Sequence, residues 1–219
     1  MLVCRGIPIP PLSWTAEEAQ AMDRWLVDEK GRTIESLMAL AGLRVAEQAR
    51  DLIVQKGLRR VLILAGPGNN GGDAVVAGEH LKEGFDVTVI RPLKGETMVD
   101  INGEDLIIDG LFGVGLDRPI ESPVREAVLA VNGSEATVLS VDLPSGLCAT
   151  TGEVVGEERG GVGVVADQTV TFVGPKTGFF KEEGPRRVGD WIAVDIGFPP
   201  EEAEAWLEQR RAEQGDRVL

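Results

Sequence analysis

A chain of 219 residues with 43% hydrophobic and 26% charged residues has a globular composition, and its length favours one large domain or two small ones. The formal net charge of −14, without any long basic run, argues against nucleic-acid binding, because the phosphate backbone would be repelled. The two cysteines indicate no disulfide framework, and no apolar run is long enough to cross a bilayer. No signal peptide is recognisable either. We therefore expect a cytoplasmic protein without a membrane segment.

Two helices are expected before the first strand of the chain. Ser13 or Thr15 can cap the first helix, and acidic residues in its first turn suit the helix dipole. Thr33 can cap the second helix, whose apolar residues recur at three- and four-residue steps as far as about Gly57.

Beyond these helices the sequence alternates between short apolar runs and helical patterns. The run 61–65 is continuously apolar and is followed by glycines, which is typical of a buried parallel strand. The remaining elements are expected as a helix at about 72–83, strands at 87–90 and 106–109, a helix near 123–132, strands at 137–142, 169–172 and 191–195, and a surface helix at 201–214. This order predicts that residues 1–219 form a single Rossmann-like domain, a three-layer α/β/α sandwich with a mostly parallel central sheet.

The connection 91–105 between the second and third strands is unusually short. It has only about fifteen residues, whereas a parallel crossover needs a dozen or more and usually includes a helix. Its proline and glycines leave little room for a helix. Either the crossover is degenerate, or part of the natural chain is missing from this sequence.

The strongest local signal is the glycine-rich segment 65–73, which follows a strand and opens a helix. Its glycines match the pattern G-x-G-x-x-G, but Arg91 stands where a dinucleotide-dependent dehydrogenase carries an acidic residue. The Walker pattern fails as well, because Gly72-Asp73 replaces the required Lys-Ser/Thr. The strand–glycine–helix arrangement nevertheless predicts that the backbone of 68–72 binds a phosphate.

Polar residues at the ends of two further predicted strands indicate a ligand site at the same edge of the sheet. Asp109 and Asp142 lie at the carboxyl ends of strands, where ligands of open α/β sheets bind, although each could simply cap a turn. Asn70, Asp109 and Ser145 together offer hard oxygen ligands suited to an alkali or alkaline-earth cation.

Four sequence blocks, in chain order, resemble the family of NAD(P)HX epimerases, also known as YjeF N-terminal domains. The blocks are 66–74 (GPGNNGGDA), 109–119 (DGLFGVGLDRP), 142–147 (DLPSGL) and 166–176 (ADQTVTFVGPK). The resemblance extends from about Ala16 to Phe198. It implies an isomerase that repairs damaged nicotinamide nucleotides, by interconverting the R and S forms of hydrated NADH or NADPH at carbon 6 of the nicotinamide ring.

The resemblance also implies the roles of individual residues. It places the substrate on two loops, whose residues are Asn69, Asn70, Gly71, Gly72 and Asp73 in the first and Gly113, Val114, Gly115, Leu116, Asp117, Arg118 and Pro119 in the second. It places Asp142 beside the hydrated ring, and a potassium ion on Asn70, Asp109 and Ser145. The hydroxyl on carbon 6 lies next to a ring nitrogen and can leave and return on the other face, so we expect Asp142 to act as acid and base in turn. We assign no catalytic role to Lys176.

Three departures from the family pattern weaken the expectation of catalysis more than the expectation of ligand binding. Ala39 and Leu40 replace two polar residues of the family's second helix, Cys148 replaces an aspartate, and the connection 91–105 is short. The rival interpretation is therefore a non-catalytic nucleotide-binding or scaffold domain of the same fold. A dehydrogenase is disfavoured by Arg91 and by a lone histidine, His80, for which we expect a structural role.

The expected partners follow partly from the resemblance. Many bacterial members carry a fused dehydratase, and because this sequence ends at Leu219 we expect the dehydratase that acts downstream to be a separate protein. Trp14 and Trp25 favour a homodimer through the N-terminal helices, although burial of both rings inside one subunit fits almost as well. The choice between hydrated NADH and hydrated NADPH stays open, with Arg91 as a hint of a phosphate contact.

Overall fold

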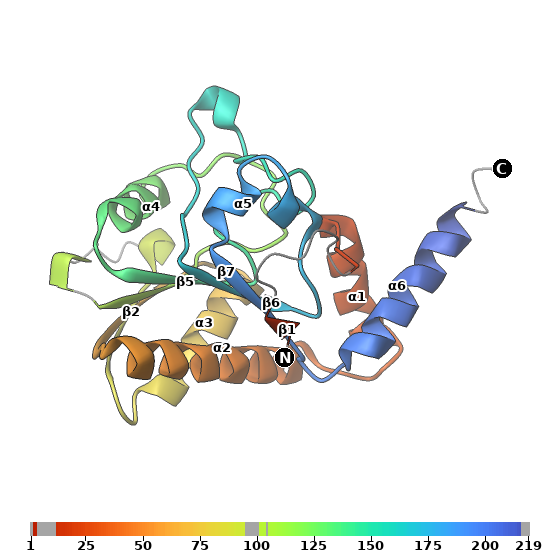
Figure 1. Ribbon diagram of the computed structural model, residues 1–219, viewed down its shortest axis with the longest axis horizontal. Coiled ribbons are helices and arrows are strands. Elements are labelled where there is room, and N and C mark those ends of the chain that lie inside the picture. Colours follow the sequence, from red (N-terminus) through yellow and green to blue (C-terminus); the bar gives the residue numbers. More distant parts are fainter. Residues whose placement is uncertain (1, 4–11, 95–100, 104, 216–219) are drawn as a thin grey trace.

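The computed structural model of the chain describes residues 2–3, 12–94, 101–103 and 105–215 and contains a seven-stranded sheet (Figure 1). The strand order is β1-β7-β6-β5-β4-β2-β3. The strands are β1 (Leu2–Val3), β2 (Arg60–Ala65), β3 (Asp86–Ile90), β4 (Leu106–Gly110), β5 (Thr137–Val141), β6 (Gln168–Phe172) and β7 (Asp190–Val194). All neighbours pair in parallel except β1, which adds an antiparallel edge to β7, so the predicted mostly parallel sheet is confirmed.

Helices cover both faces of this sheet and one of its ends. They are α1 (Ala16–Asp28), α2 (Ile34–Lys56), α3 (Asn69–Leu81), α4 (Val124–Gly133), α5 (Gly184–Arg187) and α6 (Pro200–Gly215). In Figure 1, α2 and α3 lie below the sheet, α4 and α5 lie above it, and α1 and α6 stand together at the right. The predicted three-layer α/β/α sandwich is therefore confirmed.

The continuous apolar sequence of β2 results from burial on both faces of the sheet. Val61 and Ile63 belong to the apolar core formed with α2 and α3, whereas Leu62 and Leu64 belong to the core formed with α4. All four side chains are fully buried. A strand with helices on both sides has no polar face, and this explains why the run lacks the alternation of a half-exposed strand.

The first two helices begin and end at the predicted signals. Thr15, and not Ser13, caps α1 in a capping box with Glu18, and Thr33 caps α2. Gly57 ends α2 with a left-handed backbone (φ 69°), which a residue without a Cβ adopts at little cost.

Helix α3 begins at Asn69, three residues before its predicted start at 72. The reason is the tight loop in front of it, which only glycines permit. A Cβ on Gly66 would lie 1.7 Å from the carbonyl oxygen of Leu111, and a Cβ on Gly71 would lie 2.1 Å from that of Gly66. The helix therefore starts directly after Gly68, and the polar residues of the loop form the first turn of α3.

The connection between β3 and β4 passes β2, because β3 and β4 pair with opposite sides of that strand. It contains two short 3₁₀ turns, Pro92–Lys94 and Ile101–Gly103, while 95–100 and 104 lie outside the described residues. Ile101 is buried in the core beneath α4. The described part of this connection thus matches a degenerate crossover.

The aromatic residues of the N-terminal segment pack inside the chain. Trp14 is 2% exposed and stacks on Trp206 of α6 with ring centroids 5.9 Å apart. Trp25 is half-buried and packs edge-on against Phe198, at 5.2 Å. This arrangement favours burial within one subunit, and the tryptophans no longer support the predicted homodimer.

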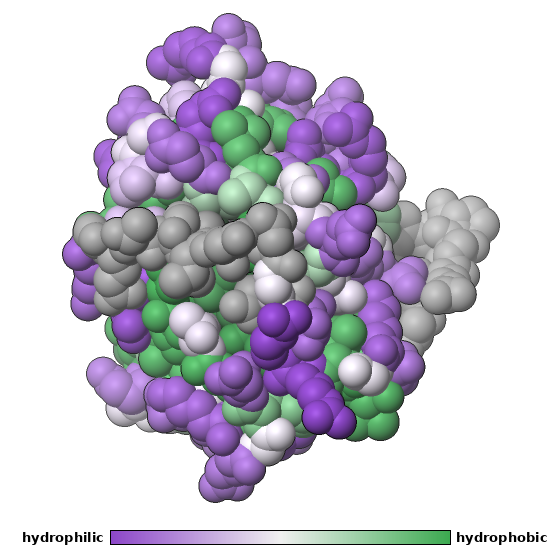
Figure 2. All heavy atoms as spheres, turned by 90° about the vertical axis from the view of Figure 1, so that its left-hand side faces the viewer, coloured by the Kyte–Doolittle hydropathy of each residue, from purple (hydrophilic) through white to green (hydrophobic). Residues whose placement is uncertain are grey.

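The surface of the molecule is largely hydrophilic, with apolar side chains among the polar ones on the face shown in Figure 2. The large exposed apolar side chains come from different elements and include Val54 on α2 and Leu129 on α4. Isolated residues of this kind are ordinary on protein surfaces. Among the helices of the described ranges, none has the length and apolar character needed to span a membrane.

Replacing Val61 by alanine should lower the free energy of unfolding by about 2 kcal/mol, because two methyl groups leave a fully buried site between the sheet and its helices. The matched control is Val54→Ala, at a position that is 77% exposed on α2. That change should leave stability unchanged or raise it by up to about 0.5 kcal/mol, since alanine is the better helix former. Urea denaturation measures both, and equal effects would contradict the two-sided burial of β2.

Candidate functional site

A cavity of about 620 Å³ lies where β2, β4 and β5 end, the edge at which open α/β sheets bind their ligands. Of the predicted substrate-binding residues, Asn69, Asn70, Asp73, Gly113–Pro119 and Asp142 line it. Gly71 and Gly72 do not line it, since they are the inner residues of the first turn of α3, packed against Gly66 and Met38. Three distant segments of sequence are thus brought to one site.

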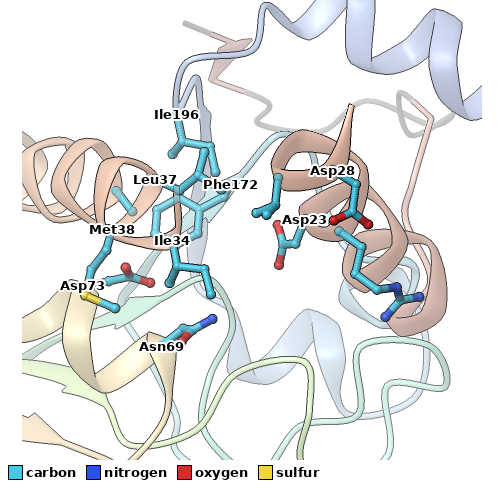
Figure 3. A pocket seen from close by; sticks show the side chains of 12 residues that line it. Asp23, Asp28, Ile34, Leu37, Met38, Asn69, Asp73, Phe172 and Ile196 are labelled. Carbon is cyan, nitrogen blue, oxygen red and sulfur yellow. The ribbon is translucent and has the colours of Figure 1, made fainter. Parts of the chain in front are cut away.

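A second, more apolar cavity of about 310 Å³ adjoins the first (Figure 3). Its lining includes Ile34, Leu37 and Met38 from α2, and it shares Asp23 and Asp73 with the larger cavity. Figure 3 shows these two carboxylates projecting toward the cavity from opposite sides, from α1 and α3. The sequence analysis missed Asp23, because it lies outside the four blocks that resemble the family.

Asp142 is held in an unusual conformation at the end of β5. Its backbone is left-handed (φ 64°), and its N–H donates to the carbonyl oxygen of Val170 at 2.7 Å. The side-chain oxygen Oδ1 accepts from Lys176 Nζ at 2.7 Å and from the backbone N–H of Phe172 at 3.2 Å, and Thr171 Oγ1 lies 3.3 Å away. Within the described part of the chain, no hydrogen bond to Oδ2 is found, so one oxygen is fixed and the other remains available to a ligand.

Lys176 is the second residue that the sequence analysis left without a role. It is 2% exposed, and its ammonium group forms an ion pair with Asp142. The same nitrogen lies within hydrogen-bonding distance of Thr171 Oγ1 (2.9 Å) and of the carbonyl oxygens of Phe172 (3.2 Å) and Gly174 (3.3 Å). A buried charge is costly without such partners, so the pair fixes the position of the Asp142 carboxylate. The sequence signal for this contact was a lysine that follows a buried strand by four residues.

Three carboxylates face the connected cavities and influence one another. Burial, together with Asp142 and Asp23, raises the pKa of Asp73 to about 8. Burial and Asp142 raise the pKa of Asp23 to about 6, although Lys176 and Arg24 oppose that rise. Much of Asp23 opens into the cavity, yet surrounding protein atoms limit its hydration. At neutral pH the site therefore holds a neutral carboxylic acid at Asp73 close to the ion-paired Asp142.

The buried carboxylate of Asp109 binds the loop that follows β5. Its oxygens accept hydrogen bonds from Ser145 Oγ (2.6 Å), Ser145 N (2.9 Å), Ser140 Oγ (2.9 Å) and Leu111 N (3.2 Å). Burial raises the pKa of Asp109, and the hydrogen bonds from Ser145 and Ser140 oppose this. Ser145 Oγ also accepts from the backbone N–H of Phe112 at 2.9 Å. Two of the three predicted potassium ligands are thus in direct contact.

The third predicted ligand, Asn70, has a buried side-chain amide whose Nδ2 lacks a hydrogen-bond partner. A Cβ on Gly113 would lie 3.4 Å from its Oδ1, so this amide sits against the second substrate loop. If the amide is turned over, its oxygen takes the unpaired position, and an oxygen there suits a cation. Oxygen donors from Asn70, Asp109 and Ser145 fit an alkali ion, whereas the described residues contain no cluster of three His, Cys, Asp or Glu side chains of the kind that holds a transition metal.

The substituted residues that depart from the family pattern do not line either cavity, whereas Leu93 of the short β3–β4 connection lines the larger one. Ala39 is exposed and Leu40 packs toward Gly197, and neither is among the described residues that line either cavity. Cys148 is half-buried beside a separate surface hollow. His80 is exposed at the end of α3, so the site contains no histidine from the described ranges. The substitutions thus leave the carboxylates of the site in place.

Replacing Asp73 by asparagine should stabilise the protein increasingly as the pH rises. The folded protein holds the proton of Asp73 up to about pH 8, whereas the unfolded chain releases it near about pH 4, so ionisation of this carboxyl lowers folding stability across that interval. We expect Asp73→Asn to gain on the order of a few kcal/mol over the unmodified protein between about pH 5 and about pH 9. Denaturation at both pH values measures this gain. The exposed Asp51→Asn on α2 is the control, and a gain that is the same at both pH values would contradict the buried neutral carboxyl.

The comparisons with known proteins agree with this arrangement. The chain matches the family model of the YjeF-related protein N-terminus over residues 34–102 and 91–178, two segments that meet at the short β3–β4 connection. It is 36% identical over 214 residues to the bifunctional NAD(P)H-hydrate repair enzyme Nnr of Thermofilum pendens, covering 83% of this chain and 39% of that protein. It is 34% identical over 210 residues to the NAD(P)H-hydrate epimerase of Weissella koreensis, covering 84% of this chain and 90% of that protein.

A solved structure shares the fold. The crystal structure of yeast ynu0 superimposes with a TM-score of 0.67 at 21% identity, and the match covers 87% of this chain and 95% of the yeast chain. The chain spans only 38% to 41% of the length of the first three bifunctional relatives. By the family model and by the identity to these relatives, the chain belongs to the family of the YjeF-related protein N-terminus.

Proposed function

We propose that this protein is an isomerase that epimerises the R and S forms of hydrated NADH or NADPH. The observation that carries the proposal is Asp142, which has a left-handed backbone and is paired with the buried Lys176 at the ligand-binding edge of the sheet, with a protonated Asp73 close by. Strained and over-constrained residues of this kind cluster at active sites. The similarity to the NAD(P)H-hydrate epimerase of Weissella koreensis supports the same activity.

The first turn of α3 is suited to hold the phosphates of the substrate. The N-terminal cap of α3 is Gly68, which provides no side-chain hydrogen bond, whereas Thr15 and Thr33 cap α1 and α2. The first backbone N–H groups of α3 are thus left for an anion, and the helix dipole favours negative charge there. Nothing lies within 4 Å of a Cβ built on Gly68, so a ligand can approach the backbone closely.

The carboxylates divide the proton transfers between them. Asp73 donates a proton to the hydroxyl on carbon 6, the carbon–oxygen bond breaks, and the lone pair of the ring nitrogen forms a carbon–nitrogen double bond, so that water leaves. The charges of Asp142 and Asp23 stabilise the resulting cation. Water returns on the opposite face and gives its proton to Asp142, which completes the inversion, and proton exchange with solvent returns Asp142 and Asp73 to their starting states. The raised pKa of Asp73, caused mainly by burial, keeps the proton donor available at neutral pH.

A potassium ion on Asn70, Asp109 and Ser145 is part of the proposal. When bound, it would supply a fixed positive charge beside the phosphate-binding loop. The contacts that already join Asp109, Ser145 and Phe112 orient the second substrate loop in the same region. The buried unpaired amide of Asn70 supports a ligand at this position.

The remaining parts of the proposal concern partners and location. We propose that the protein works in the cytoplasm and acts together with a dehydratase activity that removes the S hydrate. The bifunctional names of several relatives support a second repair activity that acts with this one. Because Ala39 and Leu40 do not line the cavities, they do not favour the alternative of a non-catalytic scaffold domain.

Asp142→Asn should lower the turnover of purified R hydrate by roughly 10²–10⁴-fold, the range typical of a general acid–base group. Affinity for ADP should fall far less, because the phosphates bind at the start of α3. The change leaves Lys176 without its anionic partner, so a thermal melt must accompany the assay to correct for unfolded protein. The control is the exposed Asp51→Asn. Near-normal turnover of folded Asp142→Asn protein would show that Asp142 only braces the strand end.

Potassium chloride should raise the melting temperature above that measured in choline chloride at equal ionic strength, since a ligand that binds only the folded state stabilises it. Ser145→Ala should remove this difference, because it deletes one of the proposed ligands. Differential scanning calorimetry provides the measurement. Identical melting temperatures of the unmodified protein in the two salts, over a range of concentrations, would rule the potassium site out.

A further inference from the structure

Three arginines line one hollow of about 440 Å³ next to the substrate cavity. They are Arg118, Arg125 and Arg159, and the hollow shares the segment 118–122 with the large cavity. The chain as a whole carries a net charge of −14, so this hollow is a locally positive site on an acidic protein. Nothing in the proposed chemistry at Asp142 uses it.

The arginines come from three segments that the fold brings together. Arg118 belongs to the second substrate loop, Arg125 to the first turn of α4, and Arg159 to a 3₁₀ turn after β5. Gly156 opens that turn with a left-handed backbone (φ 72°), and a Cβ on it would lie 2.2 Å from Cγ of Pro119. This close contact sets the turn that carries Arg159 directly against the loop that carries Arg118.

The acidic groups near the hollow do not neutralise it. Glu121 lines it, and Glu158 pairs with Arg159 at 3.0 Å, but the side chains of that pair are 69% and 73% exposed. Ion pairs at such exposure contribute little, so a phosphate can replace the carboxylate. Among the described residues, the hydrogen bond found for Arg125 is a long one, from Nη2 to the carbonyl oxygen of Gly160 at 3.5 Å. Most of its guanidinium donors therefore remain for a ligand.

We propose that this arginine hollow binds the 2′-phosphate of the adenosine ribose, so that the protein prefers hydrated NADPH to hydrated NADH. The inference rests on the proposed function, which puts the nicotinamide ring at Asp142 and the pyrophosphate at the start of α3. The adenosine end then continues along the shared segment 118–122 toward the hollow. Guanidinium groups match phosphate oxygens in bidentate geometry, and an arginine commonly accommodates the 2′-phosphate in dinucleotide sites.

Calorimetric titration with adenosine 2′,5′-bisphosphate and with AMP, which differ only by the 2′-phosphate, tests the inference without turnover. The unmodified protein should bind the 2′,5′-bisphosphate roughly tenfold or more tightly, the gain expected for charge-assisted hydrogen bonds. The double variant Arg125→Gln/Arg159→Gln should lose this preference and keep its affinity for AMP within about twofold. The matched control is Arg186→Gln on α5, which removes an exposed arginine that pairs with Glu183. It should keep the preference.

The outcomes separate this inference from the proposed function. Equal affinity of the unmodified protein for the two nucleotides, or an equal loss of preference in Arg186→Gln, would overturn the arginine site. If the preference holds while neither hydrate is epimerised, the site stands and the proposed activity fails. If both hydrates are epimerised equally well and no preference is seen, the activity stands and the site fails.

Discussion

The buried ion pair between Lys176 and Asp142 is the interaction on which the site depends. It joins the end of β5 to the segment after β6 and lies where solvent cannot screen it. Removing two charges from water is costly, and the pair persists because the ammonium group also contacts Thr171 and two carbonyl oxygens. The backbone of Asp142 is left-handed, which aspartate adopts more readily than most residues, and its N–H donates to the carbonyl oxygen of Val170. These interactions fix the position of Oδ1 of Asp142 and leave Oδ2 facing the cavity.

The glycine-rich loop after β2 allows close backbone packing at this edge of the sheet, in addition to its proposed role in ligand binding. Gly66 touches the backbone of Leu111, and Gly71 in turn touches Gly66, at distances that no Cβ would allow. The loop after β2 and the loop after β4 are therefore packed backbone against backbone. Because Asp109 also binds the loop after β5, through Ser145, the three loops at this edge of the sheet are tied to one another.

Charge is distributed along the cleft in the way that a dinucleotide with a cationic intermediate requires. Asp23, Asp73 and Asp142 gather at one end, where burial keeps Asp73 protonated at neutral pH. Backbone N–H groups at the start of α3 lie at the same cavity, and arginines line the adjoining hollow. Negative and positive groups are thus separated within a single cleft, although the chain as a whole is strongly acidic.

The sequence by itself determined six of the seven strands of the sheet, the caps of the first two helices and the family, because apolar periodicity, capping residues and glycine motifs are local properties of the chain. It also identified Asp142 as a residue at a strand end. Only the tertiary structure decided that Lys176 contacts Asp142, that Asp23 joins the site from α1, and that Trp14 is buried against α6. It likewise brought Arg125 and Arg159 to one hollow. These contacts join residues far apart in the chain, and their energies depend on burial and distance, which no local pattern encodes.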